Sequence, residues 1–448
     1  MASRDRRFAR NIGTRRHVAA FAVWSALAFL LWMAHPASAA DTNWSGVQAL
    51  SSDYTVNAGD RLIIAPGTRI QVAARAECPT GTADNETLPD CWEIIVRGEL
   101  LADDPTGGAI VFSSNGTPSD WGGIAIRDGG KATLRGVTIR DAKVGVLADD
   151  AHGTAESPNV NIAFSSFDNN QYHAIWASGE SHSAIANNLL RDHPAQLDGS
   201  VIKIYTSGDA STVVKNNLIF DNQEAGITVQ DCSPSIVNNT FIGGEYGLFL
   251  KGSTALPDVR NNIFSEYTFF GIGCDAGFLG NPDPIVEFNN VHSTAATSKP
   301  IGFGDDYWQP CGLDCPTTES NPSACGAFTG GANISTGGAG LFVDAAQHDY
   351  MLPVGSPSVD AGDPNLQYTD ASWVVGNGNE NRNDQGAYGG PGASPRAGAA
   401  VPLLSAAAAA LSLGAIGRRL RTRRMSARSP GAGSTGRWRA LFSFRQTA

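Results

Sequence analysis

Apolar and polar residues alternate in short stretches along the middle of this chain, and asparagine and glycine interrupt the alternation. Paired asparagines followed by apolar residues mark successive repeats, which begin at Asn187, Asn216, Asn238, Asn261 and Asn289. These starts are 29, 22, 23 and 28 residues apart. A second apolar alternation, as at 226–229 and 247–250, follows about eight residues into most units. A period of two is typical of β-strands, so each unit of roughly two dozen residues is predicted to contain two or three short strands.

A single unit of this kind cannot bury its apolar face alone. Stacking the units about 4.8 Å apart buries that face and pairs each strand in parallel with its equivalent in the next unit. The paired asparagines then fall at turns, where stacked side-chain amides can hydrogen-bond between units. A leucine-rich horseshoe would need a recurring leucine framework, and an antiparallel sandwich would not keep one phase over five repeats. The pattern predicts an all-β chain, a single-stranded parallel β-helix (a solenoid) over residues 41–390, with insertions near 76–92 and 303–335.

Several other stretches resemble the coils of a known group of proteins. They are 56–68, 121–124, 349–352, 355–362 and 384–388. On these motifs the chain, from about Val56 to Gly390, resembles the right-handed parallel β-helix repeat proteins of the pectin-lyase-like superfamily. The resemblance implies a right-handed helix. It does not choose an activity, because the superfamily includes polysaccharide lyases, hydrolases, epimerases and adhesins. The sequence carries no lyase-type arginine signature, which argues against lyase activity.

The N-terminal end differs in character from the repeats. Residues 1–40 contain six arginines, then an apolar stretch over 18–34 and small residues at 37–39. This order is typical of a secretory signal peptide with its cleavage site, so the mature chain is predicted to be exported. A retained transmembrane anchor is the alternative interpretation.

The C-terminal end combines apolar and basic residues. We expect a linker over 391–400, a hydrophobic transmembrane or sorting segment over 401–424, and a basic tail over 425–448. The apolar part is short for a spanning helix, and the arginines directly after it would stay on the cytoplasmic side of a membrane. The order resembles the C-terminal sorting signals of some bacterial surface proteins, although a Pro-Glu-Pro motif is missing. It predicts a cell-surface or cell-envelope location, and a loose alanine-rich tail is the alternative.

Charge narrows the possible partners once both ends are set aside. Residues 41–395 contain 16 of the 32 basic residues and 42 of the 43 acidic residues, a net charge near −26. Such a field repels nucleic acid and attracts divalent cations. We therefore expect no nucleic-acid partner, and calcium is a candidate cofactor.

All seven cysteines lie in the part predicted to be exported. Disulfides are the default in an oxidising compartment, and a zinc site would need paired short spacings or nearby histidines. We expect a disulfide between Cys78 and Cys91, which bracket an insertion, and further pairing among Cys274 and the cluster at 311–325. The odd count leaves one thiol over, and Cys232 is the candidate.

Aligning the coils on their first core residue places one polar residue of each coil in a column. The column contains Asp141, Asn169, Asp192, Asp221, Gly243 and Glu266. Asp192 and Asp221 belong to adjacent coils, which would bring their carboxylates to roughly 5 Å. Such a pair can share a proton or hold a cation such as calcium, and both arrangements occur in sugar chemistry. The alternative is that acidic and amide residues simply favour this turn.

Two further columns are predicted on the outward side of the following strand. The first contains Trp176, Lys203, Thr228, Phe249 and Gly273, and the second contains Ser178, Tyr205, Gln230, Lys251 and Asp275. Aromatic side chains interleaved with lysine and amide groups form a surface on which sugar rings can stack. The substrate-binding candidates are Trp176, Tyr205, Gln230, Phe249 and Lys251. Long loops can also cover such a face, and its aromatic residues then pack beneath them.

Two functions from different classes fit these observations. In the first, the protein is exported, tethered at the cell surface, and binds or processes an extracellular polysaccharide on this face. Lys203 is then the candidate catalytic base, while Asp192 and Asp221 supply an acid or bind a metal such as calcium. In the second, the protein is a non-catalytic adhesin or structural surface protein whose β-helix is a rigid spacer. The two differ in whether the candidate residues converge in one groove.

Overall fold

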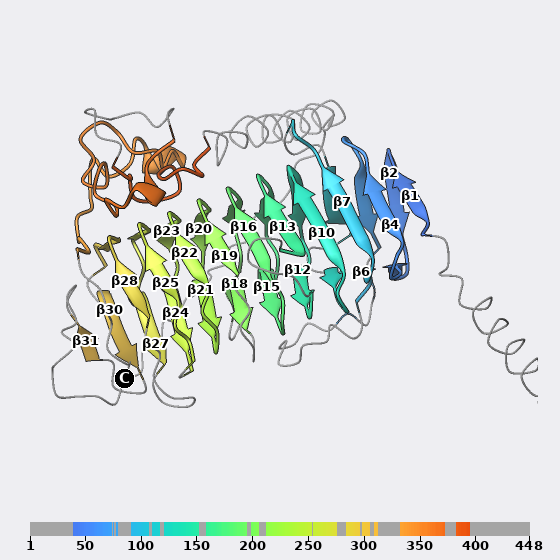
Figure 1. The fold of residues 1–448 in the computed structure, drawn as a ribbon, viewed down its shortest axis with the longest axis horizontal. Helices are drawn as coiled ribbons and strands as arrows, with labels where there is room; N and C mark the ends of the chain where they lie inside the picture. Colours follow the sequence, from blue (N-terminus) through green and yellow to red (C-terminus); the bar gives the residue numbers. More distant parts are fainter. Residues whose placement is uncertain are drawn as a thin grey trace, which may run out of the picture. The chain divides into compact units, whose positions relative to one another are not determined.

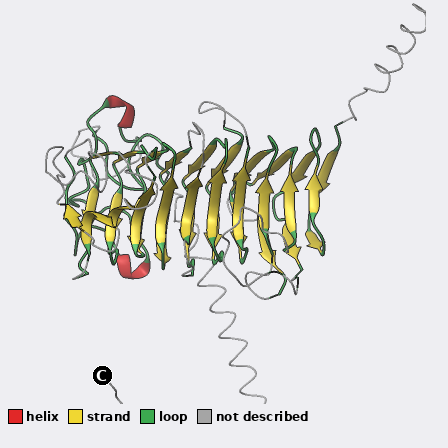
Figure 2. Ribbon diagram, turned by 90° about the horizontal axis from the view of Figure 1, so that it is seen from below, coloured by secondary structure: helices red, strands yellow, loops and turns green. Residues whose placement is uncertain are grey.

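Three long β-sheets wind around one axis in this protein (Figure 1). In the computed structural model the described residues are 39–73, 75, 78, 91–106, 110–116, 121–151, 158–194, 199–205, 212–252, 254–275, 284–295, 298–304, 309–311, 332–371 and 382–394. Each turn of the chain contributes one strand to each sheet, so equivalent strands of successive turns lie side by side (Figure 2). The described strands pair in parallel, except that β30 (Lys299–Gly304) and β31 (Gln309–Cys311) pair antiparallel. The prediction of an all-β parallel solenoid is confirmed.

We name the sheets A, B and C in the order in which the chain enters them. Sheet A contains β1 (Asp41–Trp44), β4 (Arg61–Ile64), β7 (Glu99–Asp103), β10 (Lys131–Arg135), β13 (Val160–Ala163), β16 (Ser183–Ala186), β19 (Val213–Lys215), β22 (Ser235–Val237), β25 (Asp258–Arg260) and β28 (Ile285–Glu287). Sheet B contains β2 (Val47–Leu50), β5 (Arg69–Val72), β8 (Ile110–Ser114), β11 (Val137–Arg140), β14 (Ser166–Asp168), β17 (Leu189–Arg191), β20 (Leu218–Asn222), β23 (Thr240–Gly243), β26 (Ile263–Ser265) and β29 (Asn290–His292). Sheet C contains β3 (Tyr54–Val56), β6 (Glu93–Val96), β9 (Gly123–Ile126), β12 (Val144–Asp149), β15 (His173–Ser178), β18 (Ser200–Tyr205), β21 (Ala225–Gln230), β24 (Tyr246–Lys251), β27 (Phe270–Asp275), β30 and β31.

The core lies inside the coils and consists of stacked apolar side chains. Phe241 of β23 and Phe264 of β26 stack with ring centroids 4.7 Å apart and planes only 6° from parallel. A Cβ atom added to Gly226 would lie 2.6 Å from Phe241 Cδ1, and one added to Gly247 would meet the Phe264 ring even more closely. Glycine therefore begins the apolar part of these sheet C strands because the phenylalanine rings of sheet B occupy the space that a side chain would need.

A column of buried asparagines runs along the turns between sheets A and B. The Oδ1 atom of Asn217 accepts hydrogen bonds from the backbone N–H and the Nδ2 atom of Asn188, both at 3.0 Å. The same two bonds connect Asn217 to Asn239 and continue through the next coils to Asn262, Asn289 and Asn333. Each amide also donates to a carbonyl of an earlier strand, so these buried polar groups are satisfied. The predicted coil-to-coil amide bonding is confirmed.

The two asparagines of each pair have different roles. The first adopts a left-handed backbone conformation, with φ between 55° and 58°, at Asn187, Asn216, Asn238 and Asn261. In the last repeat Phe288, with φ of 56°, takes this place, and Asn289 joins the asparagine column. The predicted repeat start at Asn289 is therefore wrong by one residue. The buried amide at the second position is the constraint that sets the phase, because the first position accepts a different residue type.

The C-terminal segment, which we define as the described residues 332–371 and 382–394, packs against sheet B (Figure 1). It includes the short 3₁₀ turns η1 (Ala345–Gln347) and η2 (Leu366–Tyr368). Phe220 points outward from β20, and its ring lies 4.9 Å from that of His348 and 5.2 Å from that of Tyr350. The segment thereby buries outward apolar side chains of sheet B that would otherwise contact water.

Outward asparagines hold the same C-terminal segment by its backbone. Asn216 Nδ2 donates to the Gly389 carbonyl at 2.7 Å, and Asn238 Nδ2 donates to the Asp384 carbonyl at 2.8 Å. These contacts place the segment on sheet B and on the turns between sheets A and B, whereas the predicted binding columns lie on sheet C.

Cys78 and Cys91 form the predicted disulfide. Cys274 is also disulfide-bonded, and Cys232 is a buried thiol whose Sγ atom donates to the Ile204 carbonyl at 3.5 Å.

Several predicted segments lie wholly or largely outside the described residues. They are the signal peptide at 1–40, the insertions near 76–92 and 303–335, the linker at 391–400, the hydrophobic segment at 401–424 and the tail at 425–448. In the part of the chain that the structure describes, no helix combines the length and apolar character needed to cross a membrane.

Replacing Asn239 by alanine should lower the free energy of unfolding by about 3 kcal/mol. The substitution leaves the buried side-chain amide of Asn217 without its acceptor and removes the donor to the Val214 carbonyl. Chemical denaturation measures the change. Asn161→Ala is the matched control, since Asn161 lies on β13 of sheet A with its side chain exposed. Equal effects of the two substitutions would contradict a stabilising asparagine column.

Candidate functional site

The outward face of sheet C carries the two predicted columns in the predicted register. The pairs Trp176–Lys203, Lys203–Thr228, Thr228–Phe249 and Phe249–Gly273 are strand neighbours. The pairs Ser178–Tyr205, Tyr205–Gln230 and Gln230–Lys251 form the second column. All five predicted substrate-binding residues therefore lie on one face, across four adjacent strands.

Trp176 does not form the exposed stacking surface that the pattern predicted. Its side chain is 3% exposed and belongs to a separate apolar cluster with Leu147 and Tyr172. The Lys203 ammonium lies 4.8 Å from the centre of the Trp176 ring, within the range of a cation–π contact. This end of the face thus matches the alternative in which the aromatic residues are covered.

A pocket of about 120 Å³ opens further along the same face, across β21 and β24. Its lining consists of Gly199, Glu224, Ala225, Thr228, Tyr246, Phe249 and Lys251. Phe249 and Lys251 are predicted binding residues, and Thr228 belongs to the predicted column. Tyr205 and Gln230 are half-buried neighbours of one another beside the pocket.

The pocket results from a change of side-chain size between successive coils. Ser200 pairs with Ala225 in the first outward position, and the equivalent position of the next coil is Tyr246. Three residues further along the strands, Thr228 is followed by Phe249. Small side chains on β21 therefore leave a space that the two aromatic rings of β24 border.

The aromatic rings and the lysine of the pocket contact each other. The ring centroids of Tyr246 and Phe249 are 4.7 Å apart with planes at 30°, and the Lys251 ammonium lies 5.1 Å from the centre of the Phe249 ring. Glu224 and Thr228 complete the lining, so the pocket is surrounded by residues with aromatic, cationic, carboxylate and hydroxyl side chains. This combination suits a ligand that has both an apolar face and several hydroxyl groups.

Asp192, directly after β17, and Asp221, near the end of β20, belong to adjacent coils as predicted, and Asp221 meets the C-terminal segment. The His348 Nε2 atom lies 3.5 Å from Asp221 Oδ2. Burial raises the pKa of the Asp192 carboxyl group, Arg191 opposes this rise, and Asp221 adds to it. All six residues of this column have positive φ angles between 53° and 76°. Asp, Asn and Gly tolerate that conformation better than most residues, so the backbone accounts for much of the column's composition.

The predicted catalytic residues do not lie on one face. Lys203 points outward from sheet C toward Trp176, whereas Asp192 and Asp221 lie at the ends of sheet B strands, and Asp221 contacts His348. Among the described residues there is no group of three or more His, Cys, Asp or Glu side chains suited to hold a metal ion. The two aspartates would therefore need further ligands to hold calcium.

Some residues of these sites were not among the predictions. Tyr246 lies two residues before the core residue Leu248, where strict alternation would place it on the inward side, so the column pattern did not indicate it. Glu224 lies in the turn before β21, where the repeat pattern carries no signal. His348 comes from the C-terminal segment, which has no periodic relation to the coils.

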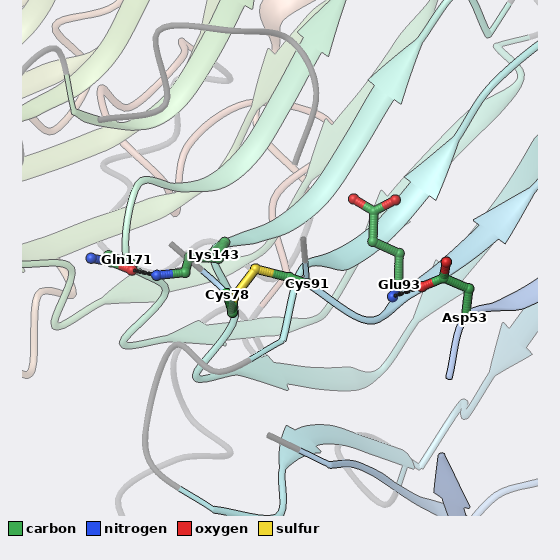
Figure 3. The surroundings of a disulfide bond; sticks show 6 residues. All are labelled: Asp53, Cys78, Cys91, Glu93, Lys143 and Gln171. Atoms are coloured by element: carbon green, nitrogen blue, oxygen red, sulfur yellow. Dashed lines mark hydrogen bonds between the residues drawn. A yellow bond between two sulfur atoms is a disulfide. The ribbon is translucent and has the colours of Figure 1, made fainter. Parts of the chain in front are cut away.

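A buried acid lies near the N-terminal end of the same face, in the coil that contains the disulfide (Figure 3). Glu93 is 7% exposed, and its Oε2 atom lies 3.9 Å from Arg127 Nη2. Within the part of the chain that the structure describes, its Oε1 atom has no hydrogen-bond partner. Its backbone N–H donates to Asp53 at 3.0 Å. Burial raises the pKa of Glu93 to about 7, Arg127 opposes the rise, and Asp53 adds to it.

Because the pKa of Glu93 is raised on folding, protonation of this group stabilises the folded state. That contribution is complete below about pH 4.5 and is lost as the pH rises through about 7. Glutamine does not titrate, so the free energy of unfolding of Glu93→Gln should rise relative to that of the wild type as the pH increases between these values. The total change in this difference should be up to about 3 kcal/mol. Denaturation at a series of pH values measures this difference, and the exposed Glu99→Gln is the control. A difference that does not change with pH would contradict the raised pKa.

Comparison with known proteins addresses the fold. The family described as the right handed beta helix region matches residues 122–291. A crystal structure of a mutant of the periplasmic alginate epimerase AlgG is similar at 12% sequence identity, covering 58% of this chain and 73% of that chain. Its TM-score of 0.34 is too low to support an inference about function. Among curated proteins, none matches the chain significantly. The three parallel sheets show that the chain has a parallel β-helix fold, which agrees with the family description matched over residues 122–291.

Proposed function

We propose that this protein binds an extracellular carbohydrate through the pocket on sheet C. The observation that carries the proposal is the lining of that pocket, where the rings of Tyr246 and Phe249 border a space that Thr228, Glu224 and Lys251 also reach. Sugar rings present C–H groups on their faces and hydroxyl groups at their edges. Aromatic rings suit the faces, and side chains that donate and accept hydrogen bonds suit the edges.

Charge favours a neutral glycan. The net charge near −26 over residues 41–395 repels a polyanion, and Glu224 brings a carboxylate to the pocket itself. Lys251 offsets that charge locally, so a neutral sugar meets neither an unbalanced cation nor an unbalanced anion.

Export is part of the proposal. The Cys78–Cys91 disulfide and the disulfide at Cys274 are typical of an oxidising compartment. The signal peptide predicted at 1–40 would deliver the chain there, and the hydrophobic segment predicted at 401–424 would tether it to the cell surface through a membrane.

Binding, rather than turnover, is the function proposed. Lys203 lies on a different face from Asp192 and Asp221, so these three residues do not form a single acid–base arrangement. A calcium ion bound near the two aspartates would act away from the pocket on sheet C. Calcium is therefore a separate condition of the binding experiment.

Replacing Phe249 by alanine should weaken glycan binding about tenfold, because it removes one ring that borders the pocket. The measurement is a screen of the secreted chain against neutral and acidic glycans, with calcium and with chelator, followed by titration of the strongest binder. Leu366→Ala is the control, since Leu366 is an exposed apolar residue of the C-terminal segment, 86% exposed.

The outcomes separate the two classes of function. Binding of neutral glycans that Phe249→Ala weakens and Leu366→Ala does not would support the proposal. A chain that binds none of the glycans in either condition would instead favour the adhesive or structural role. Thermal melting of each variant would show whether a loss of binding reflects a loss of folding.

A further inference from the structure

We infer that the glycan site continues from the pocket onto the exposed ring of Phe269, so that the ligand is an oligosaccharide with a second sugar unit stacked there. This inference rests on the proposed function and specifies the class of ligand. It assigns Phe269 a binding role that the column pattern did not predict.

The pocket itself is small. Its volume of about 120 Å³ is well below the roughly 300–1,000 Å³ that is usual for pockets enclosing a whole small-molecule ligand. A pocket of this size holds part of one sugar unit. Any longer chain must leave it over the neighbouring surface, and the composition of that surface then decides whether length improves binding.

Aromatic rings continue from the pocket toward the next coil. Tyr246, which lines the pocket, lies 5.9 Å from Phe269 with ring planes at 14°, and 6.3 Å from Phe270 with planes at 18°. The three rings are therefore close to parallel. Phe270 is only 3% exposed and supports this stack, whereas Phe269 is 42% exposed.

Gly273 of β27 explains how the rings reach this arrangement. A Cβ atom at this position would lie 3.0 Å from Tyr246 Cδ1 and 3.5 Å from Phe249 Cδ2. The rings of β24 therefore lean over the glycine toward the coil that carries Phe269. This tilt makes the pocket and the exposed ring parts of one continuous surface.

An exposed phenylalanine by itself would need no explanation, because single apolar residues are common on protein surfaces. Phe269 differs because its ring is nearly parallel to a ring that lines a pocket, which is the geometry that a chain of stacked sugar units requires.

The experiment measures affinity as a function of ligand length. The secreted chain is titrated calorimetrically with monosaccharides to hexasaccharides of the cello-, xylo-, manno- and chito-oligosaccharide series. For the series that binds, affinity should rise about tenfold when the second sugar unit is added. Phe269→Ala should remove that rise and leave the monosaccharide affinity unchanged, whereas Phe249→Ala should weaken both.

Three variants complete the test. Phe269→Leu keeps an apolar side chain without the ring and should behave like Phe269→Ala, whereas Phe269→Tyr keeps the ring and should bind like the wild type. Leu256→Ala, at a position 48% exposed, is the control and should have no effect. Affinity that does not depend on length, or an equal loss in the leucine and tyrosine variants, would overturn the inference and leave the pocket in place. Absence of binding to every series would overturn the proposed function and this inference together.

Discussion

Buried asparagine amides hold the coils of this protein in register, and the other features depend on that register. A buried amide without a hydrogen-bond partner would cancel a substantial part of the free energy of unfolding of a domain. Each coil must therefore place its asparagine next to the asparagines of the coils before and after it. A shift of one residue would break these bonds and turn core side chains toward water. The last repeat shows which constraint is the stronger, because Asn289 keeps the buried position while Phe288 replaces the outward asparagine.

A fixed register makes the outward side chains of each sheet into independent columns. On sheet B, apolar outward residues such as Phe220 are buried by the C-terminal segment. On sheet C the columns change in size from one coil to the next, and the step from Ala225 and Thr228 to Tyr246 and Phe249 forms a pocket. The binding surface therefore follows from residue size at positions that the core does not restrict.

The repeats were sufficient to predict the fold class, the asparagine column, and which outward residues are neighbours. Burial of a given column could not be predicted, because it depends on what packs against it from elsewhere in the chain. Trp176 and Phe249 occupy equivalent positions, yet only the second borders the pocket. His348 was out of reach for the same reason, since it approaches Asp221 from the aperiodic C-terminal segment.

The backbone also separates residues that the fold requires from residues that it does not. The column with Asp192 and Asp221 has left-handed φ angles at all six of its residues, a conformation that favours Asp, Asn and Gly whatever the function. Tyr246 and Lys251 lie on extended strands whose outward positions accept almost any residue type. Their identity is therefore not explained by the fold, and the pocket that they line is the stronger indication of function.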